Sequence, residues 1–218
     1  ITLPNCTTMN NFFGGNYQNI VEIGNINIPK CSIIYGMFNQ NPTIIKVGCI
    51  HSEVPVKNVQ FICNWTINIE EINFDFIMEN ADLSTAFGYC SKLKKITGIK
   101  GTCTSIVEFV RGCELLEELD LTELTLNNAR SQYAFRDCEK LTTLTLKGSV
   151  QSITEFFMNC KNLISINLDD FVFSGSITSA FYNCSSLISL ALKGTVKQDS
   201  VSKSMNSFIN LLSKKTKC

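Results

Sequence analysis

Apolar residues recur along the second half of this chain in a pattern that repeats at a nearly constant spacing. Each clear copy reads L-x-x-L-x-L, so apolar and polar positions alternate over its last letters. The best copies span residues 116–121, 141–146, 163–168 and 187–192. A period of two is typical of a β-strand with one buried face. Because these strands recur in the same register, we expect them to lie parallel and to stack.

A cysteine precedes each of these strands at one fixed position. The five cysteines, which recur once in each repeat, are Cys90, Cys113, Cys138, Cys160 and Cys184. Repeats of this length indicate a solenoid in which each repeat packs on its neighbours. In four copies a phenylalanine lies three positions before the cysteine. This return segment is too short for a full helix, so we predict a single helical turn or 3-10 piece there.

The first half of the chain carries the same template with less regular residues. Strands are predicted at Ile23–Ile28, Ile44–Cys49 and Ile69–Phe74, with a partial strand at Ile1–Leu3. Asparagine replaces the cysteine in two early copies, at Asn41 and Asn64. We therefore predict one array over residues 1–218, with about eight repeats of roughly 22–26 residues that alternate short and long. Residues 193–218 are expected to form a degenerate terminal repeat or a cap.

The residues from Ala86 to Leu192 resemble the BspA-like leucine-rich repeats of bacterial surface proteins, and the resemblance continues more weakly towards the N-terminus. Short copies look like the pattern L-x-x-I-x-L-P-x-x-V-x-x-I-x-x-x-A-F-x-x-C, whose turn matches residues 1–9. The resemblance implies an α/β leucine-rich-repeat solenoid, with parallel β-strands on one face and short helical or 3-10 turns on the other. It also implies a cell-surface or secreted protein used for adhesion, with no catalytic residues.

The net charge argues against a nucleic-acid partner, and the length of the apolar runs argues against a transmembrane segment. The chain has 19 basic and 19 acidic residues and no net charge, so it lacks the basic footprint of a nucleic-acid-binding protein. No apolar run reaches the roughly 18 residues that a transmembrane helix needs. We therefore expect neither a nucleic-acid partner nor a transmembrane segment in this chain. No export signal is present in it, and Ile1 is interpreted as a processed or cut end.

The eleven cysteines and the single histidine suggest little chemistry. The five repeat cysteines are expected to be buried thiols, since cysteine behaves as a small apolar residue in a core. Cys6 and Cys31 lie one repeat apart and are the best candidates for a disulfide, a pairing that the sequence leaves open. His51 lacks a second histidine for a common zinc site, so we interpret it as a surface residue. No metal site or other cofactor is expected.

Two pairs of neighbouring carboxylates, Glu70–Glu71 and Glu117–Glu118, could in principle form a glycosidase dyad. They occupy equivalent repeat positions, with Lys94–Lys95 on the repeat between them. An acidic, basic and acidic succession across parallel strands is ordinary charge compensation. We therefore predict that the protein is not an enzyme.

Outward strand positions in the last three repeats carry no charge, and interfaces are depleted of charge at their centres. These positions form the candidate ligand face, which consists of Thr143, Thr145, Ile164, Ser165, Asn167, Ile188 and Ser189. The sequence thus predicts a non-catalytic binding or adhesion protein that recognises a protein ligand on the surface of a host or neighbouring cell. The alternatives are a carbohydrate-binding β-solenoid and a structural spacer that projects another domain.

Overall fold

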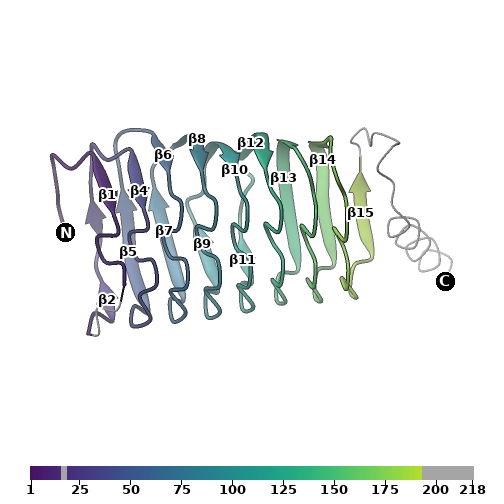
Figure 1. Ribbon diagram of the computed structural model, residues 1–218, viewed down its shortest axis with the longest axis horizontal. Helices are drawn as coiled ribbons and strands as arrows, with labels where there is room; N and C mark the ends of the chain where they lie inside the picture. Colours follow the sequence, from purple (N-terminus) through teal and green to yellow (C-terminus); the bar gives the residue numbers. More distant parts are fainter. Residues whose placement is uncertain (16–18, 193–218) are drawn as a thin grey trace.

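The computed structural model describes residues 1–15 and 19–192, which coil into a stack of parallel rungs. Figure 1 shows the rungs side by side along the long axis of the molecule, from β1 at one end to β15 at the other. Every strand pairing within the described residues is parallel, as the recurring register predicted. The expected terminal repeat or cap at residues 193–218 lies outside the described residues.

The described strands form two sheets. The nine-stranded sheet has the order β1 (Thr8–Asn10), β4 (Ile33–Tyr35), β6 (Val56–Asn58), β8 (Met78–Asp82), β10 (Gly101–Ser105), β12 (Leu124–Arg130), β13 (Thr143–Val150), β14 (Ser165–Phe173) and β15 (Ser189–Leu192). The six-stranded sheet has the order β11 (Glu118–Leu119), β9 (Lys95–Thr97), β7 (Glu71–Asp75), β5 (Lys46–His51) and β2 (Glu22–Ile23), and β3 (Ile26–Asn27) also pairs with β5. The prediction of strands on one face alone was therefore incomplete.

The second set of strands has a simple cause. In the middle rungs the chain turns a corner after the first strand and then presents apolar residues to the core again. In β8, for example, Met78 and Ala81 are buried, whereas Glu79 and Asn80 are exposed. In β13 and β14 the chain runs through this corner without a break. The repeat geometry therefore changes between the rung of β11 and the rung of β13.

The prediction of helical or 3-10 turns on the return side was wrong: the described residues contain no helix. Alternate amides of this side donate to the next rung, as Thr85 and Phe87 do to the carbonyls of Val107 and Phe109 at 2.7 and 2.9 Å. Left-handed residues recur four positions apart, such as Thr85 and Tyr89, with φ angles of 55° and 62°. The amides between them bond within the segment, as Ala86 does to the carbonyl of Leu83 at 3.1 Å, so single turns form. A continuous right-handed helix does not, because it needs negative φ at every residue and successive hydrogen bonds within its own segment.

The interior is a continuous apolar core with a stack of phenylalanine rings along the array. Phe135 lies at its centre, with ring centroids 5.3 Å from Phe157 and 6.4 Å from Phe109. Phe157 stacks in turn on Phe181 at 5.6 Å. Aromatic pairs at these separations add to the free energy of burying the rings. Each rung is thus held to the next by side-chain packing as well as by backbone hydrogen bonds.

The repeat cysteines have a second role besides filling space. The Sγ atom of each lies within hydrogen-bond distance of a carbonyl on the preceding rung, for example from Cys113 to Phe87 at 3.0 Å and from Cys160 to Phe135 at 3.0 Å. In earlier rungs Asn41 and Thr66 donate to the equivalent carbonyls. The assignment of Asn64 to this position was therefore wrong, and Thr66 occupies it. The position selects a small side chain that can donate a hydrogen bond.

We expect the repeat cysteines to be unreactive thiols in the native protein. All ten cysteines among the described residues are free, including Cys6 and Cys31. Burial raises the pKa of Cys184 to about 12 and raises the pKa of Cys138 well above its ordinary value. Because the thiolate is the reactive form, a thiol reagent near pH 8 should modify the partly exposed Cys6 much faster than Cys138. Mass spectrometry of peptides from protein alkylated before and after denaturation measures this difference.

The contrary result would be a native disulfide within the set of five repeat cysteines. Equal labelling of Cys6 and Cys138 in the folded protein would also contradict burial of this position.

Candidate ligand-binding face

Three rows of outward residues run across the rungs and make up what we call the strand face. The first row consists of Val21, Ile45, Glu70, Lys94, Glu117, Thr142, Ile164 and Ile188. A backbone hydrogen bond joins each residue of this row to the next, except between Glu117 and Thr142. The second row consists of Glu22, Lys46, Glu71, Lys95, Glu118, Thr143, Ser165 and Ser189. The third row consists of Asn25, Cys49, Asn73, Thr97, Thr145 and Asn167, with Asp120 assigned to it because it directly follows β11, and the backbone of Ala191 continues its register. Between the rungs of β11 and β13 the equivalence rests on the shared L-x-x-L pattern.

The section of the strand face up to β11 is charged, with three lysines among six carboxylates, and two ion pairs between rungs neutralise part of this charge. Lys94 Nζ donates to Glu70 Oε2 at 2.9 Å, and Lys95 forms an ion pair with Glu118 on the next rung. The hydrogen bond from Lys94 to Glu70 raises the pKa of Lys94. The lysines therefore lie between the two pairs of glutamates, which is the placement that the repeat register predicted.

The section from β13 to β15 brings the predicted ligand-face residues together. Thr143 pairs in register with Ser165, and Ser165 with Ser189. Thr145 pairs with Asn167 in the adjacent outward row. The Ser189 side chain is not among those that the structure describes.

Ile164 and Ile188 stand on adjacent rungs of this uncharged section, and the amide of Ile188 donates to the carbonyl of Ile164 at 3.0 Å. Their side chains are 44% and 58% exposed. Two neighbouring aliphatic side chains thus reach solvent without a charged group between them.

Two shallow hollows lie where the charged section meets the uncharged section. The six-stranded sheet ends at β11, and no strand pairing among the described residues joins β11 to β13. One hollow, of about 460 Å³, is lined by Glu117, Lys140, Thr142, Asn162, Ile164 and Ser186. The other, of about 380 Å³, lies over Asp120, Thr143, Thr145 and Asn167 and their neighbours. A third hollow, of about 400 Å³, lies over Asn73 and Thr97 in the charged section. Such hollows therefore recur along the strand face, and two of them lie next to the predicted ligand residues.

His51 has a partner that the sequence did not reveal. Its Nδ1 lies 2.8 Å from Asp75 Oδ2, one rung away, and Lys100 Nζ lies 3.7 Å from the other oxygen. The hydrogen bond to His51 is the main cause that lowers the pKa of Asp75. The separation of the two residues by one repeat length was the available signal. Burial raises the pKa of the nearby Cys49 thiol, which disfavours its thiolate form.

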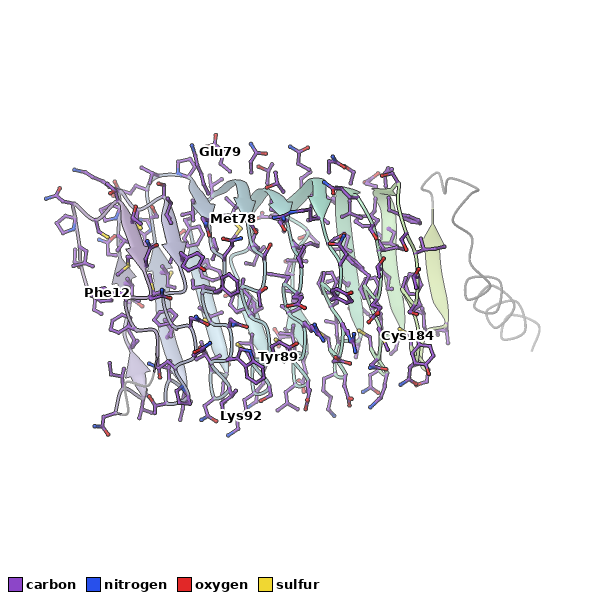
Figure 2. All side chains as sticks on the ribbon, viewed as in Figure 1. Phe12, Met78, Glu79, Tyr89, Lys92 and Cys184 are labelled. Carbon is purple, nitrogen blue, oxygen red and sulfur yellow. The ribbon has the colours of Figure 1, made fainter. Side chains whose placement is uncertain are left out.

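The return side carries an aromatic cluster that sequence reasoning also missed. The rings of Trp65 and Tyr89 stack with centroids 4.4 Å apart, and the guanidinium of Arg111 lies over Tyr89 at 5.4 Å and Tyr133 at 5.5 Å. Glu108 forms an ion pair with Arg111. In Figure 2, Tyr89 lies on the side that faces the viewer, between Glu79 at one edge of the array and Lys92 at the other. These side chains bind one another, so the cluster stabilises the return side.

The stacked parallel strands and the recurring L-x-x-L-x-L register define a leucine-rich-repeat solenoid. Residues 118–213, somewhat under half of the chain, match the family model for the BspA type leucine-rich repeat region in six copies. The resemblance found in the sequence is thereby confirmed for residues 118–213, which carry BspA-type leucine-rich repeats. No curated protein and no solved structure matches the chain. A leucine-rich-repeat solenoid is typical of a protein-interaction or repeat scaffold.

The part of the chain that the structure describes contains no group of three or more histidine, cysteine, aspartate or glutamate side chains that could hold a metal ion. The same residues include no helix with the length and apolar character of a membrane span.

Proposed function

We propose that this protein is a non-catalytic binding protein of the cell surface or the extracellular space, which recognises a protein ligand through its strand face. The observation that carries the proposal is the pair Ile164 and Ile188, exposed on adjacent rungs among hydroxyl and amide side chains. Interface centres are depleted of charge and exclude water around a few anchoring residues. The hollow beside Ile164 offers space for a side chain of the ligand.

The polar chemistry of the strand face supports binding over catalysis. Glu70 and Glu118 are engaged by lysines, so neither is available as an isolated acid or base. The location follows the resemblance to repeats of surface proteins. A carbohydrate-binding site on the strand face would be expected to have exposed aromatic rings there. Here the exposed Trp65 instead stacks on Tyr89 in the aromatic cluster of the return side.

The test begins with an array of purified extracellular-matrix proteins and glycans, on which we expect a protein to bind. For a protein that binds, Ile164→Arg and Ile188→Arg should each weaken the affinity at least tenfold, since an arginine forced into the interface would be desolvated without a partner. Surface plasmon resonance measures the affinity, and circular dichroism checks the fold. Val172→Arg is the matched control, because Val172 is similarly exposed on β14 but lies beyond the strand face.

Undiminished binding by both isoleucine variants would contradict the proposed face. Binding of glycans alone would favour the carbohydrate-binding alternative. Binding of nothing on the array, together with no self-association of the chain, would favour the spacer.

A further inference from the structure

The first row of the strand face is complementary to a second copy of the same row that runs in the opposite direction. Read from one end it is apolar, apolar, acidic, basic, acidic, hydroxyl, apolar, apolar, over Val21, Ile45, Glu70, Lys94, Glu117, Thr142, Ile164 and Ile188. Reversed and laid against itself, the row brings apolar residues opposite apolar residues at both ends. At its centre it brings a lysine opposite a glutamate.

We propose that a second copy of this chain binds the strand face, related by a two-fold axis that runs parallel to the strands between β9 and β11. Such an axis reverses the order of the rungs and keeps each outward row opposite the same row of the partner. The proposal rests on the proposed function, since it names the protein that the strand face binds. A two-fold interface uses the same patch on both copies, so it must be self-complementary.

Row one gives the most specific contacts. Lys94 meets the partner's Glu117, and by symmetry Glu117 meets the partner's Lys94. Within one chain these two residues are already neighbours on adjacent rungs. The four side chains around the axis therefore alternate in sign in both directions. Glu117 and Lys140 both line the hollow of about 460 Å³ beside this contact, so the partner's lysine is expected to lie at the Glu117 side of the hollow.

The apolar ends of row one support the same arrangement. Ile45, which is 42% exposed, meets the partner's Ile164, and Val21, which is 47% exposed, meets the partner's Ile188. The two exposed aliphatic pairs of the strand face thus cover each other. Burying them contributes the apolar part of the association, at about 25 cal/mol per Å².

The other two rows contain no like-charge contact in this arrangement. Lys95 meets the partner's Glu118, and Glu71 meets the partner's Thr143. Lys46 meets the partner's Ser165. In the third row Thr97 meets the partner's Asp120. The charged residues of the second row stand on strands that pair in register, so their order along the face is fixed by the sheet.

The other two-fold arrangement is disfavoured by charge. An axis along the array would place each rung opposite the same rung of the partner, so Lys46, Glu71 and Lys95 would each face its own copy. Like charges held opposite one another suppress an association. The charge pattern therefore selects the axis parallel to the strands.

The size of the face is adequate for a reversible dimer. Eight rungs at about 4.8 Å and three outward rows that cover about 13 Å, at about 3.3 Å per residue, give roughly 500 Å² per partner, which is in the range of weak, transient interfaces. We expect a monomer–dimer equilibrium in the micromolar range, because interfaces of this size with few aromatic anchors bind moderately.

The test is sedimentation velocity over protein concentrations from about 1 to about 200 µM, with the wild-type chain and three variants. The wild type is expected to dimerise, and Lys94→Glu and Glu117→Lys should each raise the dissociation constant at least tenfold through like-charge contacts. An equimolar mixture of these two variants should dimerise again, because both central contacts then join opposite charges. Lys92→Glu is the matched control, since Lys92 carries the same charge change on an exposed position outside the strand face.

A monomeric wild type over the whole range would overturn the inference, and so would a mixture of the two variants that stays monomeric. Dimers that the single variants leave intact would place self-association on another face. The proposed function is separate from these outcomes. If the chain is monomeric and a matrix protein still binds in a manner sensitive to Ile164→Arg, the strand face binds a foreign ligand and only the dimer is wrong.

Discussion

Replacing Phe135 by alanine is expected to destabilise the fold by about 3–5 kcal/mol, the usual cost of removing a large ring from a core. The Phe135 side chain is fully buried, and its ring lies 5.1 Å from Phe156 and 5.3 Å from Phe157. In a solenoid each rung is stabilised mainly by its two neighbours. The cavity would therefore weaken contacts with the rungs on both sides. Urea denaturation followed by circular dichroism measures the change in the free energy of unfolding.

Tyr182→Ala is the matched control for Phe135→Ala. Tyr182 is an aromatic residue of the same return side, but its side chain is 62% exposed. Its removal should change stability by less than about 1 kcal/mol. Equal shifts of the unfolding midpoint in the two variants would show that the phenylalanine stack does not hold the rungs together.

Gly148→Ala should be the second severe substitution, with a loss of roughly 3 kcal/mol or more. Gly148 lies in β13 at a φ of +94°, a conformation that side-chain-bearing residues rarely adopt. A Cβ at this position would lie 2.1 Å from the carbonyl oxygen of Leu126 on the preceding rung. The obstacle is backbone in a packed sheet, so relief requires the two rungs to separate. Thermal and urea unfolding would both report the loss.

Gly24→Ala serves as the control, because a Cβ there meets nothing within 4 Å. We expect it to be neutral within about 0.5 kcal/mol. If Gly148→Ala were as well tolerated as Gly24→Ala, the close approach of β13 to β12 would be refuted.

The strands and their register could be predicted from the sequence because both depend on local alternation. Leu144 and Ile166 alternate with polar neighbours, and a shift by one residue would expose all the apolar side chains of a strand. The structure pairs these two residues in register. The same argument placed Lys94 between the glutamates and brought Ile164 next to Ile188, since residues at equal repeat positions must stack. These parts of the candidate face follow from spacing alone.

The misassignment of Asn64 shows where spacing is insufficient. Both Phe61 to Asn64 and Cys63 to Thr66 fit the three-residue step from the core position to the donor position. The neighbouring rungs decide between them, because the amide of Cys63 bonds to the carbonyl of Ala86 and the hydroxyl of Thr66 to that of Phe38. The register of a repeat with an irregular sequence is therefore fixed by hydrogen bonds to the neighbouring rungs.

By itself the sequence determined the parallel stack, the buried cysteine position and the uncharged section of the strand face. Each of these follows from the pattern within one repeat or from its recurrence. Only the tertiary structure decided the conformation of the return side and the second sheet. It alone also decided the pairing of His51 with Asp75 and the hollows beside β11. The physical reason is that these features depend on contacts between rungs that lie one full repeat apart in the chain. An amide that finds its acceptor on the next rung no longer obeys the local preferences that predict a helical turn.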